Sequence, residues 1–490
     1  MKRIWIYSLV LLALLPAAGC NKWLDVLPEN QQVTDLYWQD KEEAEAVLGA
    51  AYVRFRGTLQ HQLIWGEARG NGLALLGSVP ASIFRLKQFE ILPNNEWAQW
   101  SGFYEVINYA NMVIKYAPEV VARDPSFSQP VMQSLLSEAY FLRGLCYFIL
   151  VRNFREVPLI TEPYMNDLYT FDVAKSAEAE IYQQIITDLE TAIPASKEVW
   201  PQVWENKGRA TKWAIYALLA DVYLWTEQYE QAIAACDRVL QSGWVGLIDG
   251  VVNNRNHWFT MFSEGNSNES IFELQFDFAR QQTNDMTQWF GTGPYTWIIS
   301  PLMVEQFNLS AEDIRGNGAS YNATTFRLWK YLGAEANTTV PRPNNDQNWI
   351  LYRMADIYLM KAEALIMLGE SHYAEALTLV NRIRQRAGIS VPLGVGSSEL
   401  EMLDIVLNER ALEFLGEGKR WYDILRVAKR NQYQYKEYLI SQVLLGVQGG
   451  SAPVIRSKLL NENSHYLPIH IDELLSNRLL EQNPYYDNVN

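Results

Sequence analysis

Three glutamates near the end of the chain have the residue type and spacing that hydrolytic chemistry would need. Glu409, Glu413 and Glu417 recur every four residues, which places them on one face of a helix. Paired carboxylates act as acid and base in glycoside hydrolysis. Arg410 and Arg420 lie close by in the sequence, so a structural network of ion pairs could use the same residues. We expect the structural role and keep a surface glycoside hydrolase as the alternative function.

Metal and nucleotide chemistry find little support in the sequence. The histidines are scattered and form no HExxH motif, no CxxC motif is present, and neither phosphate-binding glycine motif nor GxSxG occurs. The five histidines are His61, His257, His372, His465 and His470. The oxygen-rich stretch Asn344-Asn345-Asp346 could bind Ca²⁺, but we interpret it as a solvated loop. The sequence therefore predicts no catalytic residue, no metal and no cofactor.

Aromatic side chains are the residues best suited to recognising a ligand. They make up 13 % of the chain, with 17 Trp and 27 Tyr. A sugar offers an apolar ring face to aromatic side chains and a rim of hydroxyl groups to polar ones. Both types are found in two irregular segments, 56–101 and 243–349. The predicted ligand-binding residues are Arg69, Asn71, Trp97, Trp100, Trp289, Tyr295, Trp297 and Trp329. Core packing is the alternative for each aromatic.

Helices must position these segments, because apolar residues recur at helical spacing over most of the chain. One strand is expected at Ser270 to Phe276. Loops on a rigid scaffold commonly carry binding residues, so we expect the segments 56–101 and 243–349 to meet. The expected helices span about 35–54, 102–117, 131–154, 176–193, 211–226, 229–242, 350–369, 371–387 and 399–430.

Two of the expected helix pairs repeat each other at an offset of 144 residues. The matching residues are Ala220, Tyr229, Ala232 and Arg238 in the first pair and Ala364, Tyr373, Ala376 and Arg382 in the second. Small residues at fixed places let two helices approach closely, as in the tetratricopeptide unit. The predicted fold class is therefore mainly α, with tetratricopeptide-like helix pairs, large irregular loop insertions and minor β structure.

The N-terminus has the pattern of a secretory signal. Lys2 and Arg3 precede an apolar run that leads to Ala17-Ala18-Gly19-Cys20. Cysteine in this position resembles the bacterial lipobox, in which the thiol carries a diacylglyceryl group. We expect residues 1–19 to be removed, residues 20–34 to form a tether from lipidated Cys20, and residues 35–490 to form a single helical domain.

Charge and cysteine content exclude several other classes of protein. The formal charge of -15 becomes -17 once Lys2 and Arg3 are removed, which argues against nucleic acid or anionic lipid headgroups as partners. The other two cysteines, Cys146 and Cys236, lie in apolar helical patterns and are expected in the core. Stability must therefore come from packing and not from disulfides.

Four sequence blocks appear in a characteristic order. They are Leu24-Asp25 with Pro28; Glu138-Ala139-Tyr140-Phe141-Leu142-Arg143 leading to Val157-Pro158-Leu159; Asn408-Glu409-Arg410-Ala411-Leu412-Glu413-Phe414 with Arg420-Trp421-Tyr422-Asp423-Ile424; and Leu467-Pro468-Ile469 with Gln482-Asn483-Pro484. Together with the lipobox they resemble the SusD/RagB family, surface lipoproteins of Bacteroidetes. The resemblance spans the whole chain.

The resemblance implies a function as well as a fold. It implies a right-handed superhelical scaffold of helix pairs with a binding face formed by the irregular segments. It also implies a lipid-anchored nutrient-binding protein on the outer surface of the outer membrane. The expected ligand is an oligosaccharide, with peptides as a further class, and the expected partner is a SusC-like TonB-dependent transporter. A structural adaptor of the transporter that binds no nutrient is a second alternative to this function.

Overall fold

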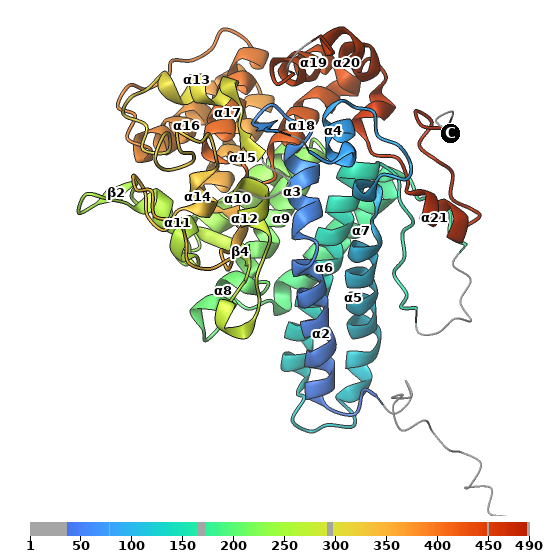
Figure 1. Ribbon diagram of the computed structural model, residues 1–490. Coiled ribbons are helices and arrows are strands. Elements are labelled where there is room, and N and C mark those ends of the chain that lie inside the picture. The colour runs from blue at the N-terminus through green and yellow to red at the C-terminus, as the bar shows by residue number, and fades with distance from the viewer. Residues whose placement is uncertain (1–36, 78, 165–171, 292–296, 448–449, 488–490) are drawn as a thin grey trace, which may run out of the picture.

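The computed structural model describes residues 37–77, 79–164, 172–291, 297–447 and 450–487 (Figure 1). The expected signal peptide, Cys20 and the tether fall outside these residues, and so does Tyr295. The helices are α2 Lys41–Arg56, α3 Leu59–Glu67, α4 Ala81–Lys87, α5 Ser101–Val120, α6 Gln129–Phe154, α7 Glu178–Ala192, α8 Val203–Gly208, α9 Lys212–Trp225, α10 Tyr229–Leu240, α11 His257–Glu264, α12 Met286–Phe290, α13 Pro301–Asn308, α14 Trp329–Leu332, α15 Met354–Met367, α16 Tyr373–Arg386, α17 Glu399–Glu413, α18 Arg420–Tyr433, α19 Lys436–Leu445, α20 Ala452–Leu459 and α21 Ile471–Ser476.

Strands are few in the described residues and pair in twos. The antiparallel pairs are β1 Leu73–Leu75 with β5 Trp297–Ile299, β2 Val251–Val252 with β3 Arg255–Asn256, and β4 Ser270–Leu274 with β6 Trp349–Arg353. The strand expected at Ser270 to Phe276 is confirmed as β4, two residues shorter. Its chain leaves the ladder where Phe276 N–H donates to Asn348 Oδ1 at 3.0 Å.

Long helices α2, α5 and α6 run side by side through the lower half of the molecule in Figure 1. Asp40 begins α2 by accepting a hydrogen bond from Glu43 N–H, which satisfies one of the free donors at a helix start. Helix α6 is long and apolar enough to span a membrane by length and composition alone. However, 94 % of its apolar window is buried within the described structure, as in the core helix of a globular protein.

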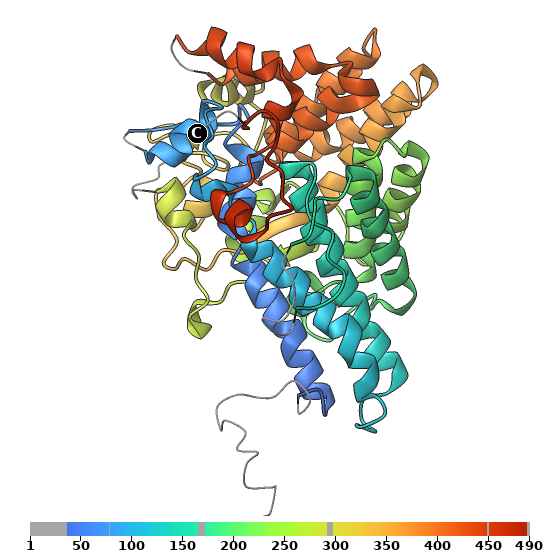
Figure 2. The ribbon, with the colours of Figure 1, turned by 90° about the vertical axis from the view of Figure 1, so that its right-hand side faces the viewer.

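The two repeated helix pairs are α9–α10 and α15–α16. Their matching alanines, Ala220, Ala232, Ala364 and Ala376, have no exposed surface, so the helices of each pair approach closely. Helix α10 also packs against α15, which joins one pair to the next. Figure 2 shows these green and orange helices stacked on one side of the molecule, opposite the blue segment around α4. The prediction of tetratricopeptide-like helix pairs is confirmed.

The two irregular segments meet, as expected, through the β1–β5 ladder. Leu73 pairs with Ile299 and Leu75 with Trp297. Next to the ladder, Ser300 Oγ donates to the carbonyl oxygen of Asn71 at 2.7 Å. A short strand from each segment therefore fixes one against the other on the side away from the helix pairs.

Two expected helices begin or end differently. The helix expected from residue 350 begins at Met354, because residues 349–353 form β6. The helix expected over 399–430 is two helices, α17 and α18, joined by a turn. Gly416 and Gly418 in that turn both have a φ of 73°, a backbone conformation that favours glycine and ends α17.

Candidate functional site

The three glutamates with catalytic spacing are buried and fully paired. Arg315 Nη1 lies 2.6 Å from Glu409 and 2.7 Å from Glu413, and Lys330 Nζ lies 2.9 Å from Glu417. Although burial alone would raise the pKa of Glu413, surrounding guanidinium groups, including those of Arg386 and Arg315, hold it well below its usual range. Burial raises the pKa of Glu409, but all three carboxylates are shielded from solvent and so cannot reach a substrate. The expected structural role is supported.

Arg410 and Arg420, which lie near the three glutamates in the sequence, contact other residues. Arg410 pairs with Asp356 at 2.7 Å and with Asp423 at 2.9 Å. Arg420 donates to Asn71 Oδ1 at 2.7 Å. Adjacent residues on a helix point about 100° apart, so Arg410 faces away from the glutamate that precedes it. Arg410 thus ties α17 to α15 and α18, as expected for a structural network of ion pairs, although the three glutamates have other partners.

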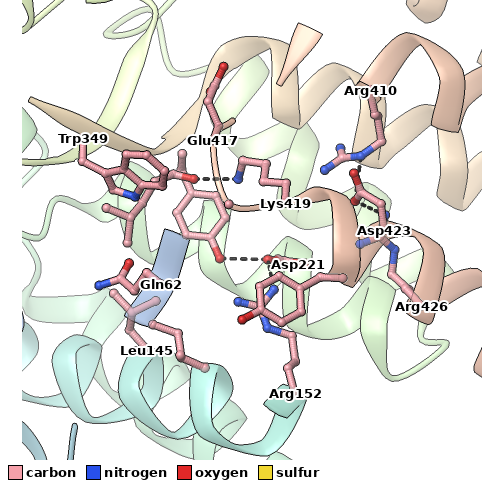
Figure 3. A pocket seen from close by; sticks show the side chains of 15 residues that line it. Gln62, Leu145, Arg152, Asp221, Trp349, Arg410, Glu417, Lys419, Asp423 and Arg426 are labelled. Atoms are coloured by element: carbon pink, nitrogen blue, oxygen red, sulfur yellow. Dashed lines mark hydrogen bonds and ion pairs between the residues drawn. The ribbon is translucent and has the colours of Figure 1, made fainter. Parts of the chain in front are cut away.

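A small internal cavity lies among further charged residues where α3, α6, α9, β6 and α18 meet (Figure 3). Its volume is about 50 Å³, which has room for water but not for a sugar ring. Asp221 Oδ2 accepts from Arg152 at 3.2 Å and from Tyr352 Oη at 2.9 Å. The Arg152 guanidinium lies between the rings of Phe148 and Tyr422, 4.0 and 4.2 Å from their centroids. These charges compensate one another and hold the helices together.

The aromatic residues predicted to stack on a ligand lie in the interior. Of the six predicted aromatics, the five that the structure describes are each at most 8 % exposed: Trp97, Trp100, Trp289, Trp297 and Trp329. The Trp100 ring packs edge-on against Phe154 with centroids 4.9 Å apart. Trp329 Nε1–H donates to the Glu335 carbonyl oxygen at 2.9 Å. Their burial contradicts direct stacking, because the irregular segments need their own apolar cores. Tyr295, the sixth, lies outside the described residues.

Arg69 and Asn71 are buried as well. Arg69 donates to the His465 carbonyl oxygen at 2.7 Å and lies 4.3 Å above the Trp421 ring. The Asn71 side-chain amide donates to Gln442 Oε1 at 3.0 Å. Both side chains tie the segment 56–101 to the C-terminal part of the chain. Their expected contact with a ligand is corrected to a structural role.

A larger hollow lies between α2, α8 and the chain that follows β4, and we call it the α2–β4 groove. Its volume of about 620 Å³ is within the usual range for ligand sites. Residues from one face of α2 line one wall: Glu45, Leu48, Gly49, Tyr52, Val53 and Arg56. The other lining residues are Leu135, Trp204, Gly208, Arg209, Asn266, Phe272, Glu273, Leu274, Gln275, Phe276, Asp277, Arg280, Gln282 and Asp346.

Aromatic rings are available to a ligand in this groove. Trp204 on α8 is 46 % exposed, and Phe276 just after β4 is half-buried. Val53 on α2 is also exposed and lines the groove. Phe84 and Phe326 are also exposed, but neither lines the groove. The groove thus offers apolar surfaces that suit the C–H face of a sugar ring.

Arg56 supplies hydrogen-bond donors in the same groove. Its Nη1 donates to the Gln275 carbonyl oxygen at 3.2 Å, and its guanidinium carbon lies 5.7 Å from the centroid of the Phe276 ring. Burial lowers the pKa of Arg56. It forms no ion pair with any residue that the structure describes. Its remaining N–H groups can therefore donate to a ligand.

A partly buried network holds the groove in shape. Tyr52 Oη donates to Glu138 Oε2 at 2.8 Å and accepts from Ala210 N–H at 2.9 Å. Arg209 lies 2.7 Å from Glu138 and 3.6 Å above the Trp200 ring. Although burial alone would lower it, the Glu138 carboxylate raises the pKa of Arg209 above its usual value. These contacts fix the lining side chains before a ligand arrives, which favours binding.

One wall of the groove lies in a segment that the sequence predicts to bind a ligand, and the other wall does not. The wall after β4 belongs to the predicted binding segment 243–349, whereas Tyr52 and Trp204 belong to helices. A usable signal was the polar stretch around Trp204, because a Trp among polar residues at a helix start has no apolar stripe to join.

The stretch considered for Ca²⁺ makes contacts within the protein. Among the residues that the structure describes, no group of three His, Cys, Asp or Glu side chains could hold a metal ion. Asp346 lies 3.3 Å from Arg342 Nη2, and the Asn345 carbonyl oxygen accepts from Asn284 N–H at 2.9 Å. The prediction of a solvated loop, with Ca²⁺ unsupported, is kept.

Comparison with protein families matches two models to separate parts of the chain. Residues 305–486 match the model described as SusD family. Residues 22–224 match the model described as starch-binding associating with outer membrane. The two matches lie one after the other along the chain, and together they include nearly all of α9 from the first repeated pair and both helices of the second pair.

Curated relatives and solved structures agree with these matches. A SusD-like protein P38 of Formosa agariphila is 26 % identical, over 87 % of this chain and 92 % of its own length. A SusD-like protein of Bacteroides ovatus is also 26 % identical, over 84 % of this chain and 80 % of its own. A SusD superfamily structure from Bacteroides fragilis has a TM-score of 0.76 at 20 % identity, covering 92 % of this chain and 100 % of the other. A laminarin-binding SusD-like protein has a TM-score of 0.71 at 24 % identity, covering 91 % and 99 %.

Proposed function

Since this chain belongs to the SusD family, we propose that it captures glycans at the cell surface and passes them to a SusC-like TonB-dependent transporter in the outer membrane. As a member of this family it is a binding protein and not an enzyme. The observation that carries the glycan part of the proposal is the α2–β4 groove. It combines exposed aromatic surface with hydrogen-bonding side chains on a prearranged wall.

Two comparisons support a glycan as the ligand. One matching family model is described as starch-binding, and one structural relative as laminarin-binding. Starch and laminarin are both glucans, which carry no charge. Laminarin and starch are therefore the first probes for this chain, with peptides as the comparison class.

The expected lipid anchor suits this function. Lipidated Cys20 would hold the chain at the membrane through the tether of residues 20–34. The first described helix, α2, begins at Lys41 and supplies one wall of the groove. A ligand site so near the anchored end of the chain would stay close to a transporter in the same membrane.

Affinity electrophoresis tests the proposal. The purified chain should migrate more slowly in gels that contain laminarin or starch than in gels without polysaccharide. The polysaccharide that retards it should keep its length after incubation with the chain. Retardation by no polysaccharide, with peptides bound instead, would change the ligand class. If the protein bound no nutrient yet copurified with a transporter, the adaptor alternative would replace the proposal.

A further inference from the structure

The inner wall of the α2–β4 groove contains a carboxylate that is only half satisfied. Glu273 on β4 is buried, yet it lines the groove. Its Oε2 accepts from Asn266 N–H at 3.1 Å, from Gln275 Nε2 at 3.3 Å and from Asn348 Nδ2 at 2.8 Å. Its Oε1 has no hydrogen-bond partner among the described residues.

A second oxygen beside it is also unsatisfied. Asn266 lines the groove, and its Oδ1 has no partner within the described part of the chain. The backbone contact between Asn266 and Glu273 places both residues at one point of the wall. Most buried acceptors in folded proteins are paired, so an unpaired oxygen on each of two residues in contact indicates a missing donor.

The charge of Glu273 is not compensated by an ion pair with any residue that the structure describes. Lys207 on α8 is close enough for its ammonium group to interact electrostatically with Glu273, but its hydrogen bond goes to the Ser270 carbonyl oxygen at 2.6 Å. A carboxylate without an ion-pair partner attracts O–H donors and repels an anion placed beside it. The part of a ligand that contacts Glu273 must therefore bring hydroxyl groups and no negative charge.

We infer that Glu273 and Asn266 determine the specificity of the groove by accepting hydrogen bonds from hydroxyl groups of a neutral sugar, so that neutral glycans bind and uronic or sulfated glycans do not. This inference rests on the proposed glycan-binding function. Trp204 and Phe276 then provide the ring contacts, and Arg56 donates to oxygens of the same ligand. The sugar supplies the donors that the wall lacks.

Asn266 offers a substitution that leaves the backbone undisturbed. Its φ is 51°, in the left-handed region that glycine adopts freely, so Asn266→Gly removes the side-chain oxygen without strain. Asn253 on the β2–β3 turn has a φ of 49° and does not line the groove. Asn253→Gly is therefore the matched control. Glu273→Gln, which keeps the side-chain shape and removes the charge, is the second variant.

Calorimetric titration with laminarin and soluble starch, each beside its sulfated derivative, tests the inference. Wild type and Asn253→Gly should bind a neutral polysaccharide, and its sulfated derivative about tenfold more weakly or not at all. Asn266→Gly should bind the neutral polysaccharide about threefold to tenfold more weakly, as expected for one lost hydrogen bond. Glu273→Gln should narrow the difference between the neutral and sulfated forms.

Two results would overturn the inference and leave the proposed function standing. One is equal binding by Asn266→Gly and Asn253→Gly, and the other is a preference of the wild type for a sulfated derivative. Absence of binding to any glycan would instead remove the proposed function, and the inference with it. Thermal unfolding of each variant, followed by circular dichroism, confirms that the compared proteins are folded.

Discussion

At the scale of single residues, type and spacing could identify candidates but not their exposure. Trp97 and Trp204 both lie in short segments rich in polar residues, yet Trp97 is buried beneath its own segment and Trp204 lies at the rim of a groove. The difference depends on which element covers each ring. That is tertiary information, which hydrophobic periodicity within one segment does not contain.

Replacing Trp204 tests the aromatic contact directly. Trp204→Ala should weaken glycan binding about twofold to tenfold, because one ring contact contributes about 0.5–1.5 kcal/mol. Calorimetry with the bound polysaccharide measures this change. Trp244→Ala is the matched control, since Trp244 is 48 % exposed and does not line the groove. An equal loss in both variants would show that the effect is not specific to the groove.

Replacing Trp297 tests whether it belongs to the core. Trp297→Ala should lower the free energy of unfolding by about 3–5 kcal/mol, as expected for a large ring removed from a packed interior. Urea denaturation measures this, again with Trp244→Ala as the control. If Trp297→Ala were as stable as wild type but no longer bound glycan, the ring would be a ligand contact after all.

At the scale of elements, the helices were predictable and the boundaries set by tertiary pairing were not. The spacing of Ala220 and Ala364 with their repeats identified both helix pairs, because close helix packing needs small residues at fixed positions. Residues 349–353 also fit a helical pattern but pair with β4 as a strand. Likewise, the meeting of 56–101 with 243–349 could be expected in outline, whereas the strands that join them could not.

Ion pairs between these elements make stability depend on pH. Although burial alone would raise it, Arg426 and Arg430 lower the pKa of Glu363 from 4.5 to about 2. A carboxyl group with a lowered pKa stabilises the folded protein at pH values above its pKa in the unfolded chain. This stabilisation is lost as the pH falls toward and through its pKa in the folded protein. The free energy of unfolding should therefore fall by roughly 2 kcal/mol between pH 6 and pH 3 through this group alone.

Glu363→Gln separates this contribution from the rest. Urea denaturation at pH 6 and pH 3 should show a smaller difference for this variant than for wild type. Glu375→Gln, which changes an exposed glutamate on α16, is the control and should keep the wild-type difference. An unchanged pH dependence in Glu363→Gln would contradict the assigned role of the ion pairs with Arg426 and Arg430.

At the scale of the whole molecule, the chain combines an expected lipid anchor at its N-terminal end with a groove built on a helical scaffold. The net charge of -15 fits a partner other than nucleic acid. Helix α2 links membrane anchoring to ligand binding, since it follows the expected tether and lines the groove. The extent of one domain over residues 35–490 stays a prediction.

Removing the lipidated thiol tests the anchor. Cys20→Ala protein expressed in the native cell should leave the membrane fraction, because acyl chains provide the expected attachment. Cell fractionation and immunoblotting measure the distribution. Cys236→Ala, which changes a buried cysteine in α10, should stay with the membrane. Normal amounts of Cys20→Ala protein on intact cells would contradict the tether and leave only the contact with the transporter.

A crystal structure of the chain with a bound polysaccharide fragment would show whether the α2–β4 groove is the glycan-binding site. We expect sugar rings in the α2–β4 groove, in contact with Trp204 and Phe276. The hydroxyl groups of the sugar should point toward Glu273. Sugar bound elsewhere, for instance beside the exposed rings of Phe84 or Phe326, with the groove empty, would contradict this expectation.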